Sequence, residues 1–325
     1  MTDLRVRPAT RADAAELSAL VNAAEEVDRT GEHCVVEDLL EALDNPLIDP
    51  ARDWVVAEEA GRVVGHCHLR PRAPGEDVLH VGIEGTVRPS HRRRGLGSRL
   101  LPLMVARADD YVREHGAHLR PVVTGIAPST NADLATLLER QRMRPERFSF
   151  LMEVDLHDGT TGSVPAVPEG YTLSDWQGID HDEIREAHNA AFVDHYGFAP
   201  WSAPMWAHHV AGSRAHRPGL SLLLRDASGA VAAYVQTAEF EAVTAATGLR
   251  EAFVGKVGTV EAHRRRGLAS VLLDLALDRY RREGFDRSAL DVDSENPTGA
   301  LAIYERAGYR TAVRWTHFRL EDRVG

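Results

Sequence analysis

Residues that could hold a phosphate group occur twice in this chain of 325 residues. Residues 91–96 and residues 263–268 have the same sequence, His-Arg-Arg-Arg-Gly-Leu. Each copy follows a short β-branched segment and opens an apolar-periodic stretch that predicts a helix. A turn rich in Arg and Gly between a strand and a helix can bind an anion, because the first N–H groups of a helix are unpaired and carry partial positive charge.

The pattern Arg/Gln-x-x-Gly-x-Gly/Ala after a strand resembles the acetyl-CoA pyrophosphate motif of the GNAT N-acyltransferases. Two matches, about half a chain apart, indicate two tandem GNAT modules, an arrangement similar to that of mycothiol synthase-like acetyltransferases. The resemblance implies that acetyl-CoA is the acyl donor and that the strand and turn bind it. In the second half this role is carried over to Gly258, Thr259, Val260, Arg264, Arg265, Arg266, Gly267, Leu268, Ala269, Ser270 and Asn296. In the first half it is carried over to Thr86, Val87, Arg92, Arg93, Arg94, Gly95, Leu96, Gly97 and Ser98.

The order of the expected elements supports a duplicated module, because strands and helices follow each motif in the same sequence in both halves. The resemblance implies an α/β fold in which each module is a twisted, mostly antiparallel sheet flanked by helices. The strands at 253–260 and 288–292 should splay apart to admit the pantetheine arm. Residues 157–170 are rich in Gly, Pro, Ser and Thr. We therefore predict an N-terminal module at 1–156, a linker at 157–170 and a C-terminal module at 171–325.

The last expected helix of each module differs at the position where a proton donor could lie. In GNAT enzymes a tyrosine on this helix commonly serves as the acid toward sulfur, and Tyr304 falls at that position in the second half. The first half has Leu138 there, and Arg142 and Met143 replace Gly308 and Tyr309. Leucine cannot donate a proton. An interior proline, Pro102, also predicts a kink in the long helix of the first half. We therefore expect catalysis in the C-terminal module, while the N-terminal module either binds acyl-CoA or serves as a structural partner.

The sequence offers several candidates for the base that would take the proton of the attacking amine. Glu239 and Glu241 lie at the end of an expected strand, and alternation would put both on one face toward the acceptor. We favour Glu239 as the base and assign Glu241 to acceptor binding. Alternatives are Glu251, Asp291 and Asp293, or a water chain to one of these carboxylates.

An aromatic loop after the first helix of the second half is the remaining candidate for acceptor binding, through His195, Tyr196 and Trp201. In GNAT folds this region roofs the acceptor site. Two interpretations stay open: the loop is a lid over a small amine, or its aromatic side chains fill the core.

Composition excludes several classes of function. A formal net charge of −11 argues against non-specific nucleic-acid binding, and no apolar run approaches the roughly 18 residues of a membrane span. We expect a cytoplasmic protein, a monomer or homodimer, without a metal, because the histidines lack convincing ligand spacing. We predict an N-acetyltransferase that acts on a small-molecule primary amine. The alternatives are an acyltransferase of protein or peptide amines and a non-catalytic acyl-CoA sensor or scaffold.

Overall fold

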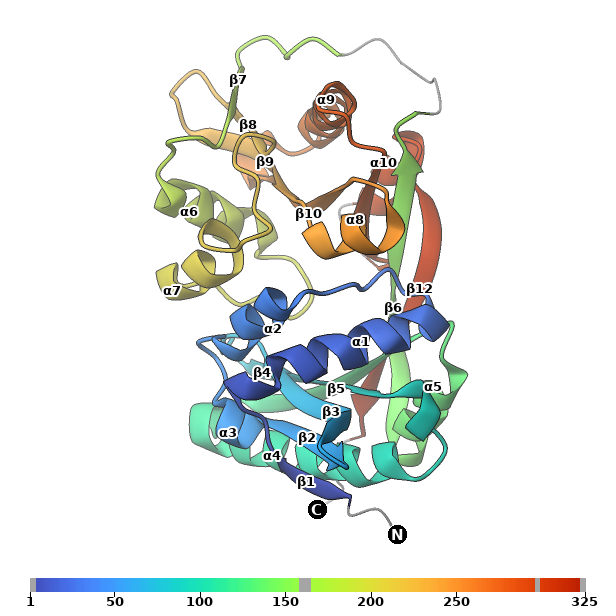
Figure 1. The fold of residues 1–325 in the computed structure, drawn as a ribbon. Helices are drawn as coiled ribbons and strands as arrows, with labels where there is room; N and C mark the ends of the chain where they lie inside the picture. The colour runs from blue at the N-terminus through green and yellow to red at the C-terminus, as the bar shows by residue number, and fades with distance from the viewer. Residues whose placement is uncertain (1–3, 158–164, 296–298, 322–325) are drawn as a thin grey trace. The chain divides into compact units, whose positions relative to one another are not determined.

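The computed structural model describes residues 4–157, 165–295 and 299–321. The chain divides into two compact units (Figure 1). Unit 1 comprises Met1–Phe148 and Val313–Gly325, and unit 2 comprises Ser149–Ala312. Each unit is a mixed α/β module built on a mostly antiparallel sheet, as the sequence predicts.

The first half of the chain contains 13 elements, which form most of unit 1. They are β1 (Arg5–Pro8), η1 (Arg11–Asp13), α1 (Ala14–Asp28), α2 (Val36–Leu43), α3 (Pro50–Asp53), β2 (Trp54–Glu59), β3 (Arg62–Pro71), β4 (Val78–Val87), η2 (Pro89–His91), α4 (Leu96–Gly116), β5 (Arg120–Pro128), α5 (Ala132–Arg140) and β6 (Met143–Asp155). The helix α4 continues through Pro102, so the proline does not end it.

The second half contains 13 further elements, most of them in unit 2. They are β7 (Thr172–Asp175), α6 (His181–Phe192), α7 (Ala203–Trp206), the π-helical η3 (Ala207–Ala211), β8 (Leu222–Arg225), β9 (Val231–Ala238), α8 (Glu241–Thr247), β10 (Glu251–Thr259), η4 (Glu261–His263), α9 (Leu268–Arg282), β11 (Arg287–Asp293), α10 (Ala300–Arg306) and β12 (Arg310–Leu320). No helix in the described ranges is both long and apolar enough to cross a membrane.

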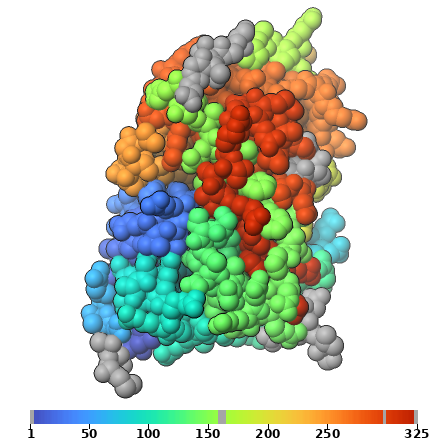
Figure 2. Space-filling model, turned by 90° about the vertical axis from the view of Figure 1, so that its right-hand side faces the viewer, coloured from blue at the N-terminus to red at the C-terminus, as the bar shows by residue number. Residues whose placement is uncertain are grey.

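Two strands are exchanged between the halves of the sequence. In unit 1, Trp315–Arg319 of β12 pairs antiparallel with Thr124–Pro128 of β5. In unit 2, Ser149–Asp155 of β6 pairs antiparallel with Arg287–Asp293 of β11. The strands β6 and β12 are neighbours and lie side by side, green and red in Figures 1 and 2. Each unit therefore completes its sheet with a strand from the other half of the sequence.

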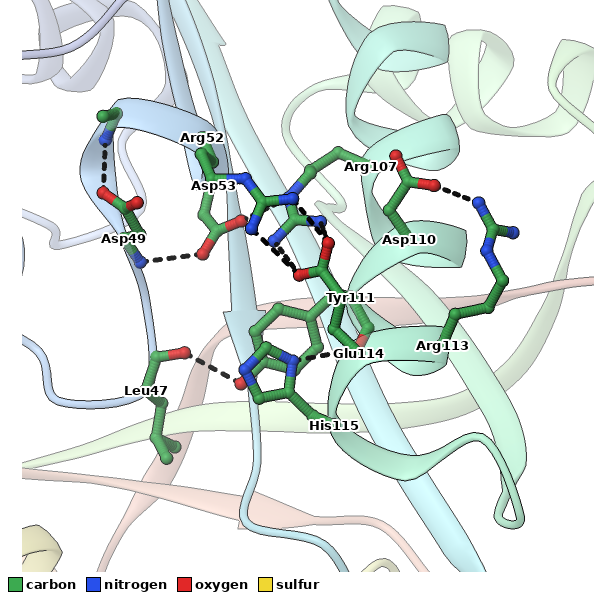
Figure 3. Close-up of polar contacts among 11 residues, drawn as sticks. Leu47, Asp49, Arg52, Asp53, Arg107, Asp110, Tyr111, Arg113, Glu114 and His115 are labelled. Atoms are coloured by element: carbon green, nitrogen blue, oxygen red, sulfur yellow. Dashed lines mark hydrogen bonds and ion pairs between the residues drawn. The ribbon is translucent and has the colours of Figure 1, made fainter.

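Unit 1 is stabilised by an apolar core between α4 and its sheet, and by an ionic network that joins α4 to α3. Arg107 of α4 donates from Nε to Asp53 Oδ1 at 2.6 Å and from Nη2 to Glu114 Oε2 at 3.0 Å (Figure 3). Tyr111 donates its hydroxyl to the Leu47 carbonyl at 2.8 Å. Asp53 is 1% exposed, so this network fixes α3 against α4 in a region of low solvation.

Unit 2 has apolar clusters on both faces of its sheet. On one face, Leu272, Leu273, Ala276 and Tyr280 of α9 pack against the strands. On the opposite face, α6 and α7 pack through a cluster that contains Trp176, Ile184, Trp206, Val210, Leu223 and Tyr234. The side chains of β10 alternate between these two faces, which decides where each of its polar groups points.

Candidate active site

The two Arg/Gly turns have the same backbone conformation. Gly267 and Gly95 cap the helices that follow, with φ of 75° and 80°, and Arg265 and Arg93 also have positive φ, at 61° and 63°. The first intrahelical bonds are Val271 N–H to Gly267 O and Arg99 N–H to Gly95 O, both 3.1 Å. The three amides before each of these therefore point out of the helix end, where they can bind a phosphate.

The first arginine of each motif holds the turn in place. Arg264 donates to Asp194 Oδ2 at 2.7 Å and to Ala191 O at 3.0 Å. Arg92 donates to both oxygens of Asp28, at 2.6 Å each. Because each guanidinium already forms an ion pair with a carboxylate, it connects its turn to the C-terminal end of a helix. That helix is α6 in unit 2 and α1 in unit 1. From the motif alone, we predicted only a role in donor binding for these two arginines.

The second arginine differs between the units. Arg93 forms an ion pair with Asp133 of α5, so its charge is partly neutralised. Arg265 is exposed and makes no side-chain ion pair or hydrogen bond within the described residues. Counting from the matched positions Leu138 and Tyr304, the residue that corresponds to Asp133 is Gly299, which has no charge. At this position, unit 2 therefore has a cation that is unpaired within the described residues and could bind a pyrophosphate, whereas the matching arginine of unit 1 is paired.

The strands β10 and β11 separate beside this turn. Their parallel pairing covers Glu251–Val254 and Arg287–Leu290 and then stops, although β10 continues to Thr259. A β-bulge lies at the same point, where the register between β9 and β10 shifts between Val254 and Lys256. A Cβ atom at Gly255 would lie 2.1 Å from Gln236 Oε1, so a larger residue there would displace the buried side chain of Gln236. In unit 1, β3 and β4 pair in unbroken register from Gly65 to Pro71. Bulges of this kind often mark functional sites.

Tyr304 lies on α10, buried to 9% exposure. Burial raises the pKa of Tyr304 to about 12, so the hydroxyl stays protonated at neutral pH. Other buried tyrosines of unit 2 use their hydroxyls internally: Tyr309 with Ser288 at 2.8 Å, and Tyr280 with Thr237 at 2.6 Å. The described residues offer no such partner to the hydroxyl of Tyr304. In unit 1, Leu138 fills the matching position in the apolar core.

The match between the two last helices extends to their ends. Gly308 has φ of 98°, and Arg142, at the equivalent place, has φ of 62°. Met143 and Tyr309, the next residues, are both fully buried. Asn296 lies outside the described residues.

Glu239 and Glu241 do not lie together on a strand. The strand β9 ends at Ala238 and Glu241 begins α8, so the expectation that alternation puts both on one face is wrong. Glu239 accepts from Arg217 at 2.9 Å and from Arg250 at 2.7 Å. Burial alone would raise the pKa of Glu239, but the hydrogen bonds from Arg250 and Arg217 lower it below its usual range. A carboxylate held in this way is a weak proton acceptor.

Asp291 is one of the alternative candidates for the base. It follows Leu290, the last paired residue of β11, and so lies where the strands separate. Its side chain points away from α9, because Leu290 and Val292 pack in the α9 core. The side chain of Asp291 is exposed in the structure, and a partial loss of solvation beside the strands raises the pKa of Asp291 to about 6, which leaves a carboxylate at neutral pH with raised basicity.

The side chains of the aromatic loop differ in burial, so some fit the interpretation of a core plug and others that of an exposed lid. Trp201 packs against the apolar cluster of Trp176 and Trp206, and its ring lies 4.3 Å from Lys256 Nζ. Tyr196 is 39% exposed. His195 stacks near Phe192, and burial, aided by the charge of Arg264, lowers its pKa. Lys256, which the sequence did not single out as functional, is therefore part of this site. Its signal was that it is the only lysine in the chain.

Comparison with known proteins places these features in a family. The model of the acetyltransferase (GNAT) family matches residues 18–135 and 181–309. A mycothiol acetyltransferase of Clavibacter sepedonicus is 31% identical over 248 residues, which cover 74% of this chain and 73% of that protein.

Solved structures agree with this assignment. A GCN5-related N-acetyltransferase from Sphaerobacter thermophilus superposes with a TM-score of 0.73 at 25% identity, covering 97% of this chain and 95% of that one. A tandem GNAT protein from the clavulanic acid biosynthesis pathway has the same fold, with a TM-score of 0.69 at 19% identity, covering 98% and 99%. The chain therefore belongs to the GNAT acetyltransferase family, and it is an N-acetyltransferase that carries two GNAT modules.

Proposed function

We propose that unit 2 transfers an acetyl group from acetyl-CoA directly to a primary amine of a small molecule. The observation that carries this proposal is the hydroxyl of Tyr304, which is protonated and has no hydrogen-bond partner in the described residues. It lies on the helix that follows the splayed strand β11. The mycothiol acetyltransferases to which the chain is similar support a small acceptor.

The residues of unit 2 fit acetyl-CoA at two places. The free amides of Leu268, Ala269 and Ser270, with Arg265, suit the pyrophosphate. The separation of β10 and β11 after Val254 leaves backbone groups of β10 unpaired by β11, and these suit the amides of the pantetheine arm. When bound, acetyl-CoA supplies an acetyl group activated as a thioester.

The proton transfers are assigned to two side chains. Asp291 accepts a proton from the acceptor ammonium or amine, because an amine with a pKa near 10.4 is mostly protonated at neutral pH. Tyr304 donates its proton to the departing sulfur. Positioning of both reactants between these groups supplies the remaining acceleration. The matching place in unit 1 holds Leu138, so we assign unit 1 no proton transfer.

The test compares Tyr304→Phe with Tyr309→Phe. Both remove one hydroxyl from a buried ring of unit 2, but the hydroxyl of Tyr309 already bonds to Ser288. We expect Tyr304→Phe to lower kcat about 10²-fold, within the range for general acids, with little change in acetyl-CoA affinity. Tyr309→Phe should lose about 1 kcal/mol of stability and keep its kcat. Free CoA is measured with a thiol reagent. Equal kcat in Tyr304→Phe and wild type would remove Tyr304 from the mechanism.

A further inference from the structure

The only lysine of the chain lies inside the candidate acceptor site. Lys256 follows the bulge residue Gly255 on β10, two residues beyond the last parallel pair with β11. Val254 and Val257 pack toward α9, whereas Lys256 points to the opposite face, with Nζ 4.3 Å from the centre of the Trp201 ring. The side chain is half-buried. The lysine is therefore at the point where a bound acceptor would meet the splayed strands.

The ammonium of Lys256 has no carboxylate partner among the described residues. Other half-buried cations of unit 2 do have one: Arg217 with Glu239 at 2.9 Å, Arg264 with Asp194 at 2.7 Å and Arg287 with Glu251 at 2.6 Å. A cation that has lost part of its hydration is costly unless it is paired. The contact with Trp201 compensates for only part of that cost.

The groups that α6 and β9 place around Lys256 are neutral. His188 of α6 shares a hydrogen bond of 2.6 Å between its Nδ1 and the hydroxyl of Tyr234. Burial lowers the pKa of His188 to about 3, so its ring carries no charge at neutral pH. Gln236 is the cross-strand partner of Lys256. Burial lowers the pKa of Lys256 to about 8, which still leaves an ammonium at pH 7. The site thus has two charges, the ammonium of Lys256 and the carboxylate of Asp291, and no ion pair joins them within the described residues. A carboxylate that arrives with a ligand can therefore balance the ammonium.

We propose that Lys256 binds a carboxylate of the acceptor, so that the acceptor is a small amine of the amino-acid type. The proposal rests on the proposed function and narrows its acceptor class. The single ammonium matches one carboxylate at a short distance from the reacting amine, and the ring of Trp201 borders the carbon atoms between them. Lysine acts here as a point charge, in contrast to the planar fork of an arginine.

The kinetic test uses the twenty common amino acids and their carboxamides as matched pairs that differ in the carboxylate alone. Release of CoA is followed for wild type, Lys256→Met and Lys256→Arg. We expect wild type to prefer the acid of a pair, and Lys256→Met to raise KM for the acid at least tenfold while KM and kcat for the amide stay unchanged. Lys256→Arg, which keeps the charge, should recover part of the loss. Equal use of acid and amide by wild type would overturn the proposal. A fall of kcat for both in Lys256→Met would assign Lys256 to proton transfer instead.

A binding test does not depend on turnover. Reductive methylation with ¹³C-formaldehyde labels Lys256 and the N-terminal amine, and Lys256→Met identifies the lysine signal. Titration with N-acetylated amino acids should shift that signal, and the corresponding N-acetylated carboxamides should not. If no amine releases CoA but the acids still shift the signal, the proposed function fails and the anion site stands. If acids and amides leave the signal equally unmoved, the anion site is refuted.

Discussion

Replacement of Gly267 by glutamate tests which unit binds the donor. Gly267 has φ of 75° at the start of α9, and an added Cβ atom would meet nothing within 4 Å. Gly95 has φ of 80° at the start of α4 and is equally open. The same substitution in the two units therefore imposes the same backbone strain, and Gly95→Glu is a matched control for Gly267→Glu.

The substitution has two effects, backbone strain and charge repulsion, and they differ in how they change acetyl-CoA affinity. A side chain in the left-handed region costs about 1–2 kcal/mol, and this cost applies with or without ligand, so it lowers the melting temperature but not the affinity. A carboxylate about 4 Å from a phosphate charge repels it by about 1 kcal/mol in water and about 4 kcal/mol at a partly shielded surface. Gly267→Glu should therefore weaken acetyl-CoA binding by about 5-fold to 1000-fold. Gly267→Ala, which adds strain alone, should bind almost as wild type.

The assay is calorimetric titration with acetyl-CoA, together with CoA release and thermal unfolding. We expect Gly267→Glu to lose affinity and turnover, and Gly95→Glu to keep turnover, with similar decreases in melting temperature. The pairing of Arg93 with Asp133 gives the physical reason, because it puts a carboxylate beside the turn of unit 1. Loss of turnover in Gly95→Glu, with normal turnover in Gly267→Glu, would show that catalysis has been assigned to the wrong unit.

Two further predictions concern stability and pH. Asp53→Ala leaves the buried Arg107 only its bonds to Glu114 and should lower the free energy of unfolding by about 3 kcal/mol, the lower end of the range for a broken buried pair. Asp110→Ala removes an exposed pair with Arg113 and should cost less than about 1 kcal/mol. Denaturant unfolding measures both losses, and equal losses would contradict the buried network. Because the pKa of Asp291 is raised to about 6, its carboxylate is available as a base above that pH. We expect kcat/KM to rise between about pH 5 and pH 7, with an inflection near the pKa of Asp291. The variant Asp291→Asn should lose this inflection, and Asp293→Asn should keep it. If Asp291→Asn keeps the inflection, the titrating group is not Asp291.

The duplicated motif predicted the fold because its signal is local. The strand at Val78–Val87 and the turns at Gly95 and Gly267 depend on short stretches of sequence, and the structure has them where the pattern indicates. The place of Tyr304 on the last helix was also predicted, because it is fixed by its spacing from Gly308, which follows that helix. The match to Leu138 was made by aligning Glu139 with Glu305, and in the structure the residues four positions after Leu138 and Tyr304 both have positive φ.

The features that sequence did not reveal depend on contacts between distant residues. The ion pairs of Glu239 were not predicted, because its partners Arg217 and Arg250 are 22 and 11 residues away in the sequence. The helix α8 went unrecognised because it is short, so Glu241 was assigned to a strand. The importance of Lys256 follows from its contact with the ring of Trp201 and from the bulge at Gly255, and neither feature can be predicted from the periodicity of the sequence.

The exchange of β6 and β12 gives unit 2 a structural need for the first half of the chain, whether or not that half carries out chemistry. Residues Thr124–Pro128 of β5 find their partner in the C-terminal strand of the chain, and β11, which borders the proposed site, finds its partner in β6 from the first half. An exposed sheet edge is unfavourable because its N–H and C=O groups lack partners. A chain of residues 171–325 alone would leave β11 without β6 at that edge. The first half therefore contributes to the site of unit 2 through its backbone, and this contribution places no demand on residue 138. With leucine at that position, β6 still pairs with β11, so the sheet of unit 2 remains complete.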